Sequence, residues 1–215
     1  MTDHAAPSPE LREAAPHRPG LLARAARGLL ALFGWRVEVV WPPGPKAVIA
    51  VYPHTSNWDF VIGMLGRLAC GLPVSWLGKH SIFRWPFRTL LRKLGGIAVD
   101  RRQHHGLVTQ MLAEFSRRPV LWLALAPEGT RKHTDHLKSG FWRIACEARV
   151  PLGLGYLDYR RRVVGVAEWI HLSGDPEEDL ARLRSFYADK AARKPAQASE
   201  IRFRDCASVS DRIKA

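Results

Sequence analysis

A histidine and an aspartate five residues apart are the side chains in this sequence best suited to proton transfer. His54 follows an apolar run that ends at Pro53, and Asp59 stands just before the apolar helical pattern that begins at Phe60. A carboxylate near a helix N-terminus is stabilised by free amides and by the helix dipole. It could orient one imidazole nitrogen while the other accepts a proton from a substrate hydroxyl. The pair therefore predicts general-base chemistry in which the substrate supplies the nucleophile, although a loop histidine beside a helix-capping aspartate is the simpler interpretation of the pair alone.

A second cluster has the parts of an anion-binding site. Glu128-Gly129-Thr130-Arg131 follows the continuous apolar run 120–126. The glycine lets the backbone approach a ligand closely, the threonine adds a hydroxyl, and the arginine offers a planar fork that matches phosphate. The glutamate could accept from a substrate hydroxyl or hold the arginine in place.

The predicted secondary structure brings these clusters to one edge of a sheet. Strands are predicted at 35–40, 47–51, 74–77, 97–99, 120–126, 151–157 and 163–170, and helical patterns at 21–33, 60–71, 103–118, 141–148 and 175–192. This alternation predicts a single α/β domain, with a mixed, mostly parallel sheet flanked by helices. His54, Glu128 and the pair Asp100-Arg101 all follow strands, and ligands bind at the carboxyl ends of strands in such sheets. The three clusters are therefore expected to converge.

Four regions are expected along the chain. They are a disordered N-terminal tail at 1–19, an amphipathic helix at 20–34, the α/β domain at 35–194 and a poorly ordered C-terminal tail at 195–215.

Composition narrows the classes of partner. Lysine and arginine outnumber aspartate and glutamate by 33 to 20, which gives a formal charge of +13 and favours nucleic acid, anionic lipid or phosphorylated substrates. Cys70, Cys146 and Cys206 are too far apart to suggest a disulfide framework or a zinc site. No apolar run approaches the roughly 20 residues that span a bilayer. The first twenty residues lack the apolar core of a signal peptide.

Two segments have a composition that would suit binding to an anionic surface. In 21–33, one arc of about 120°, opposite Arg24 and Arg27, holds Leu21, Leu22, Ala25, Leu29, Leu32 and Phe33. This helix would either pack that arc on the domain core or lie in a membrane interface. In 81–94, aromatic residues and leucines alternate with basic residues, a pattern that fits nucleic acid, anionic lipid or an ordinary solvated helix face.

A group formed by His133, Asp135 and His136 has metal-ligand residue types, but it falls in one loop-like stretch with no matching cluster elsewhere. A solvated loop is the favoured interpretation.

Four sequence blocks, in order, resemble the glycerolipid acyltransferase family, which includes 1-acyl-glycerol-3-phosphate acyltransferases. The blocks are His54-Thr55-Ser56-Asn57-Trp58-Asp59, Gly95 to Arg101, Pro127-Glu128-Gly129-Thr130-Arg131, and Val150-Pro151. Together they cover roughly residues 47–157. Two positions depart from the family pattern, because Ala126 stands where an aromatic residue is usual and Lys132 where a serine is common. These departures bear on the identity of the acceptor more than on the reaction type.

The resemblance implies an acyltransferase-like fold and the transfer of an acyl chain from a thioester to a hydroxyl, with His54 as general base and Asp59 orienting it. The residues implied in substrate binding are Lys79, Arg101, Glu128, Gly129, Thr130 and Arg131. The implied acceptor is a lysophospholipid such as 1-acyl-glycerol-3-phosphate, and the product phosphatidic acid. No metal or cofactor is expected, because acyl-CoA or acyl-carrier protein would serve as co-substrate. An anionic membrane surface is the expected partner, and the cytoplasmic face of the membrane the expected peripheral location.

Other functions remain as alternatives. The same base could acylate another lyso-lipid, for example one with an amino-acid headgroup. A basic nucleic-acid-binding domain would leave His54 and Asp59 unexplained, and the sequence lacks the motifs of the nucleic-acid folds. A non-catalytic acyl-binding protein is disfavoured by the presence of both residues. The absence of a GxSxG motif argues against a serine hydrolase of the common kind, and Cys146 lacks a basic partner for a covalent route.

Overall fold

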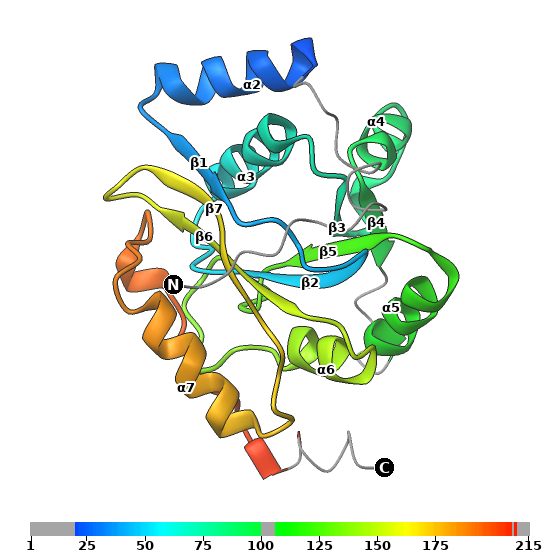
Figure 1. The fold of residues 1–215 in the computed structure, drawn as a ribbon, viewed down its shortest axis with the longest axis vertical. Coiled ribbons are helices and arrows are strands. Elements are labelled where there is room, and N and C mark those ends of the chain that lie inside the picture. Colours follow the sequence, from blue (N-terminus) through cyan, green and yellow to red (C-terminus); the bar gives the residue numbers. More distant parts are fainter. Residues whose placement is uncertain (1–19, 100–105, 208, 210–215) are drawn as a thin grey trace.

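The computed structural model describes residues 20–99, 106–207 and 209, which form a seven-stranded sheet with helices on both faces (Figure 1). The strands are β1 Arg36–Val39, β2 Lys46–Val51, β3 Val74–Lys79, β4 Gly96–Val99, β5 Leu121–Leu125, β6 Leu152–Asp158 and β7 Val163–Ile170. The helices are α2 Leu21–Leu32, α3 Asn57–Cys70, α4 Arg88–Lys93, α5 Gly106–Arg117, α6 Gly140–Glu147 and α7 Pro176–Tyr187, with short 3-10 turns at η1 His80–Ile82 and η2 Pro195–Gln197. The predicted tail at 1–19 lies outside the described residues.

The sheet order is β1-β7-β6-β2-β5-β3-β4, and every pair is parallel except β6 with β7. The connection between β6 and β7 is a tight turn, too short for the crossover that a parallel pair requires. The predicted mixed, mostly parallel sheet is confirmed. Because β6, β2 and β5 are parallel neighbours, the residues that follow these three strands meet at one edge.

Two apolar layers hold the helices against the sheet. On one face, α5, α6 and α7 contribute residues such as Met111, Ile144 and Leu180 to the largest core cluster. On the other face, α3 packs on the sheet through Ile62 and Ala69, and α2 packs against α3. The central strand β2 is buried on both sides, which explains its unbroken apolar sequence.

Helix α3 begins at Asn57, immediately after the loop that carries His54. Ser56 is its N-cap, and Ser56 and Asp59 form a capping box in which each supplies a partner for the other. The helix ends at Gly71, whose φ of 68° is the left-handed conformation that glycine adopts without steric cost. Local sequence therefore places Asp59 in the first turn of α3, as predicted.

Helix α2 packs with its small residues inward. Ala23, Ala26 and Leu30 are its buried side chains, and they face α3 and the β1–β7 side of the sheet. The large apolar arc is exposed instead, with Leu21 84%, Leu32 78% and Phe33 61% accessible. Packing of this arc on the domain core, one of the two interpretations of the sequence, is therefore wrong. Contact with a membrane interface, the other, stays a prediction.

Residues 195–207 pack against the rest of the domain, unlike the poorly ordered tail expected at 195–215. Ser199 and Phe203 are buried, and Phe203 packs against the rings of Phe141 and Trp142 in α6. The backbone of Leu137 also donates to the carbonyl of Arg202. The sequence prediction failed here because apolar residues in this stretch are too sparse to show a helical or strand period, while the contacts that order it are long-range.

Across the described part of the chain, none of the helices combines the length and the apolar character that crossing a bilayer would demand.

Candidate active site

The loop between β2 and α3 brings His54 and Asp59 together. The His54 Nδ1 atom lies 3.6 Å from Asp59 Oδ2, with 18% of the histidine side chain and 1% of the aspartate side chain exposed. This separation is an ion-pair distance, slightly longer than a hydrogen bond. Since Nδ1 faces the carboxylate, Nε2 is the nitrogen available to a substrate proton.

Asp59 is fixed by hydrogen bonds on both carboxylate oxygens. Its Oδ2 accepts from the amides of Thr55 and Ser56 at 2.6 and 2.7 Å. Its Oδ1 accepts from the hydroxyl of Tyr159 at 2.5 Å. The carboxylate is therefore buried with donors on each oxygen, as a buried charge requires.

The surroundings of His54 favour its neutral form. Burial lowers the pKa of His54 below its ordinary value of 6.5, the nearby Asp59 carboxylate raises it, and the positive charge of Arg131 lowers it further. A histidine that is neutral at physiological pH can act as a base. The effect of Arg131 also means that the second predicted cluster lies close enough to His54 to act on its charge.

Glu128 joins the two clusters from inside the protein. It is 1% exposed, and its Oε2 accepts from the His54 amide at 2.6 Å while its Oε1 accepts from the Ser199 amide at 3.0 Å. Burial raises its pKa to about 7, against the opposing effect of these two amide bonds. The Glu128 carboxylate thus fixes the backbone at His54. Its role as a substrate ligand stays a prediction.

The rest of this cluster turns outward after β5. Gly129 has a φ of 65°, which permits the tight turn closed by its amide on the Ala126 carbonyl. The Thr130 hydroxyl accepts from the Lys132 amide at 3.2 Å. Arg131 is exposed at the tip of the turn. An exposed guanidinium beside a neutral histidine can meet an anionic group of an incoming substrate.

The C-terminal segment crosses both loops. The Lys194 amide donates to Thr55 Oγ1 at 3.2 Å, and the ring of His133 meets the Ala198 carbonyl at 2.9 Å. With its amide nitrogen turned toward them, Gln197 donates to the carbonyls of Thr55 and Arg131 at 2.9 and 3.0 Å. Residues 194–199 therefore tie the His54 loop to the Arg131 turn.

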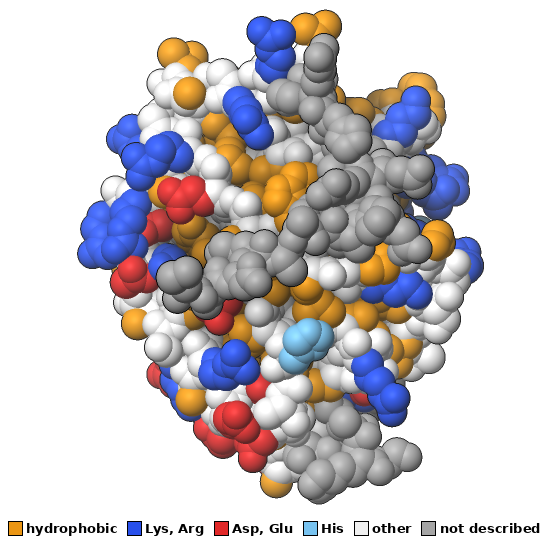
Figure 2. All heavy atoms as spheres, viewed as in Figure 1, with side chains coloured by type: hydrophobic (Ala, Val, Ile, Leu, Met, Phe, Trp, Pro, Cys, Tyr) orange, Lys and Arg blue, Asp and Glu red, His pale blue; other side chains and the backbone are white. Residues whose placement is uncertain are grey.

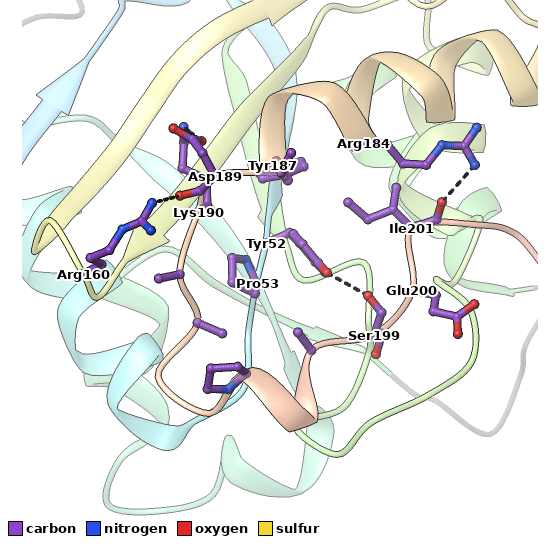
Figure 3. Close-up of a pocket in the computed structure, with 15 residues that line it drawn as sticks. Tyr52, Pro53, Arg160, Arg184, Tyr187, Asp189, Lys190, Ser199, Glu200 and Ile201 are labelled. Atoms are coloured by element: carbon purple, nitrogen blue, oxygen red, sulfur yellow. Dashed lines mark hydrogen bonds and ion pairs between the residues drawn. The ribbon is translucent and has the colours of Figure 1, made fainter.

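Beside this segment is an open hollow of about 790 Å³. Figure 3 shows Tyr52 and Pro53 inside it, with the Tyr52 hydroxyl pointing to the Ser199 carbonyl, a hydrogen bond of 2.7 Å. Its basic lining residues already have protein partners: Arg160 donates to the Asp189 carbonyl and Arg184 to the Ile201 carbonyl. The charges around the hollow thus stabilise the segment that surrounds it.

On the opposite face of the sheet is a narrow apolar cleft of about 100 Å³ between α3 and the strands. Val51 and Leu157, at the carboxyl ends of β2 and β6, belong to its wall, and Gly63 and Gly66 line it from α3. A Cβ atom added at Gly63 would meet nothing within 4 Å, so the helix is open to the cleft at this position. The cleft extends to the strand end that precedes His54 by three residues.

Several predicted residues are not tested by this geometry. Arg101 lies outside the described residues. Lys79 is the last residue of β3, two strands away from β2, and its predicted role stays a prediction.

In the loop with metal-ligand residue types, His136 Nδ1 and Asp135 Oδ1 form a pair at 2.5 Å. In the described part of the chain no group of three or more His, Cys, Asp or Glu side chains is arranged to hold a metal ion.

Two contributors to the site were missed in the sequence. Tyr159 and Ser199 lie outside the four family-like blocks, and each contacts a carboxylate of the site. A signal for Tyr159 existed, since it is a polar aromatic residue directly after a predicted strand. Recognising it required the position of β6 beside β2, which the sequence order of the strands does not reveal.

Comparisons with known proteins agree with this arrangement. A protein-family model described as Acyltransferase matches residues 40–153, more than half of the chain, and the match includes His54, Asp59 and Arg131. No curated protein matches the sequence at a significant level. Among solved structures, the 1-acyl-sn-glycerophosphate (LPA) acyltransferase PlsC from Thermotoga maritima has a similar fold, with a TM-score of 0.52 at 14% identity over 80% of each chain. The resemblance predicted from the four sequence blocks is thereby confirmed, and the chain belongs to the acyltransferase family.

Proposed function

We propose that the protein transfers a fatty acyl chain from a thioester to the hydroxyl of a lysophospholipid such as 1-acyl-glycerol-3-phosphate. The observation that carries this proposal is the convergence of a neutral, carboxylate-paired His54 with the exposed Arg131. The fold shared with an enzyme named as an LPA acyltransferase supports the choice of acceptor class.

In the proposed reaction, His54 Nε2 accepts the proton of the acceptor hydroxyl as its oxygen attacks the thioester carbonyl. The C–O bond forms in this attack, which gives a tetrahedral intermediate, and the C–S bond breaks when the intermediate collapses. The imidazolium then returns the proton to the departing thiolate, so that the base is regenerated. Asp59 stabilises the transient positive charge on the ring. Arg131 binds the anionic headgroup, which brings the hydroxyl to the histidine.

The first experiment is an in vitro transfer assay with labelled acyl-CoA and acyl-carrier protein against a panel of lyso-lipids, including 1-acyl-glycerol-3-phosphate and amino-acid-headed lipids. We expect transfer to a phosphate-bearing acceptor, and a loss of 10²–10⁴-fold, on the order expected for a positioned base, in His54→Ala. The exposed substitution Arg204→Ala is the matched control and should retain activity. Near-normal turnover by folded His54→Ala protein would rule out the mechanism.

The pKa of His54 provides a second prediction. Because burial and Arg131 both lower it, the ring should titrate below 6.5 in the wild type. Arg131→Gln removes a positive neighbour and should raise the pKa, whereas Asp59→Asn removes a negative neighbour and should lower it further. Histidine ring signals in an NMR pH titration follow the protonation of His54 itself. Unchanged titration in both variants would contradict the proposed proximity, and Arg204→Gln serves as the remote charge control.

We also propose that the apolar cleft under α3 receives part of the acyl chain of the thioester. Its walls are mostly apolar, with Ile49, Val51 and Val164 beside the rings of two tryptophans, and its end at Val51 and Leu157 adjoins the loop of His54. An extended hydrocarbon gains free energy from leaving water in proportion to its buried area. Gly63 keeps space open for it on the α3 side.

A larger residue at Gly63 should therefore shorten the acyl chains that the enzyme accepts. Gly63→Leu is expected to lower kcat/KM for a palmitoyl donor by about tenfold while an octanoyl donor is used nearly as well as by the wild type. Leucine also favours the helix over glycine, so loss of folding is not expected. Gly140→Leu, in a helical position that is open but outside the cleft, is the control. An equal loss for both donors would argue against the assignment.

We further propose that the protein docks on an anionic membrane through the end formed by α2, α4 and the start of α3. The exposed apolar residues there are Leu21, Leu22, Leu29, Leu32 and Phe33 of α2, Trp58, Phe60 and Val61 of α3, and Ile82, Trp85, Phe87 and Leu90 around α4. Figure 2 shows hydrophobic and basic side chains together at the end of the molecule where α2 lies, while acidic side chains lie along the left side and near the lower end. Apolar insertion and attraction of basic residues to anionic lipid act together on such a surface.

Vesicle co-sedimentation tests this docking. The wild type should bind vesicles of anionic phospholipid, bind less as salt rises, and lose most binding in the double variant Leu29→Asp/Phe33→Asp. Both side chains are exposed, at 44% and 61%, so the fold should tolerate the change. The matched control is Val40→Asp/Val120→Asp, which adds the same charges at exposed apolar residues outside this end. Equal binding by the two double variants would refute the assigned surface.

A further inference from the structure

Tyr159, the residue that follows β6, contacts Asp59 of the His54–Asp59 pair. It lies outside the four sequence blocks. We propose that Tyr159 is a positioning residue, whose hydroxyl holds the Asp59 carboxylate in the orientation that faces Oδ2 toward His54 Nδ1. The activity measurements that test this inference rest on the proposed acyl transfer. The titration that tests it rests only on the geometry of His54 and Asp59.

The hydrogen bonds of Asp59 show why a second anchor matters. The amides of Thr55 and Ser56 both bind Oδ2, the oxygen that also lies 3.6 Å from His54. Hydrogen bonds to one oxygen alone still allow the carboxylate to pivot about that oxygen, by a combined rotation of the two side-chain torsions. The Tyr159 hydroxyl, 2.5 Å from Oδ1, prevents that rotation by holding the other oxygen.

Tyr159 is itself rigidly placed. Its amide donates to the Ala191 carbonyl at 2.9 Å, and its ring packs edge-on against Trp35, with centroids 4.9 Å apart and planes at 88°. Burial, together with the hydrogen bond to Asp59, raises the pKa of Tyr159, so that the hydroxyl keeps its proton and remains a donor. A fixed donor on a rigid support is what an orienting residue requires.

Other charged groups around the pair belong to the same arrangement. Arg193 interacts with the Tyr159 hydroxyl and lies over the ring of Trp58, 5.5 Å from its centroid. Glu128 approaches from β5 and Arg131 from the turn after it, and both act on the charges of the pair. Tyr159 differs from these residues because it contacts the carboxylate directly.

The test is a double-mutant cycle between Tyr159→Phe and Asp59→Asn. In the wild-type background Tyr159→Phe should lower kcat by about tenfold with little change in KM, since the hydroxyl is bonded to Asp59 and acts through it. In the Asp59→Asn background the same substitution should cost less than about twofold, because its target is gone. Equal losses in both backgrounds, or no loss in the wild-type background, would overturn the proposal.

A titration that needs no turnover separates this inference from the proposed function. If Tyr159 orients Asp59, then in Tyr159→Phe the carboxylate turns away and the pKa of His54 falls toward its value in Asp59→Asn. An unchanged His54 titration would overturn the positioning role even if acyl transfer is confirmed, whereas a shifted titration without any acyl transfer would reject the proposed function alone. Ser173→Ala, which removes a hydroxyl from the buried carboxylate of Asp179 elsewhere in the protein, should alter neither kcat nor the titration.

Discussion

The buried carboxylate of Asp59 imposes the strongest constraint on the arrangement around the site. An ionised group that leaves water costs several kcal/mol unless hydrogen bonds replace its hydration. Here the donors come from the loop amides of Thr55 and Ser56 and from Tyr159, which follows the neighbouring strand β6. Satisfying them curls the loop after β2 tightly into the first turn of α3. The same curl sets His54 beside the carboxylate, so the stability of the loop and the orientation of the histidine have one physical cause.

A second buried carboxylate extends this arrangement to the adjacent strand. Glu128 follows β5 and accepts the His54 amide on one oxygen and the Ser199 amide on the other. Its need for two donors explains why the C-terminal segment must cross the site, although that segment contributes little regular secondary structure. Gln197 and Lys194 add contacts from the same segment to the His54 loop. The chain beyond α7 is thus structurally part of the site.

Close approach between α2 and α3 decides which face of α2 is buried. Ala23 and Ala26 allow α2 to lie closely against α3, and Arg27 donates to the Ala69 carbonyl at the end of α3 at 2.9 Å. Leu30 packs with them, whereas the other leucines of α2 and Phe33 are left outside. A soluble protein would ordinarily bury such an arc, and an exposed apolar patch of this kind marks a surface for interaction. Trp58 and Phe60, in the first turn of α3 beside the loop of the site, are exposed as well.

The strands, most helix positions and the fold class could be predicted from the amino-acid sequence, because apolar periodicity and short-range capping are local properties. The family could be predicted from four short sequence blocks. The sequence also predicted that His54 pairs with Asp59, since residues on either side of a helix start are close in any such loop. Tertiary structure alone decided which strands are neighbours, and therefore that Tyr159 reaches Asp59 and that Glu128 contacts the His54 backbone. It also decided which face of α2 is buried. Contacts between residues far apart in the chain depend on strand order and packing, and neither is encoded in the local pattern of a single segment.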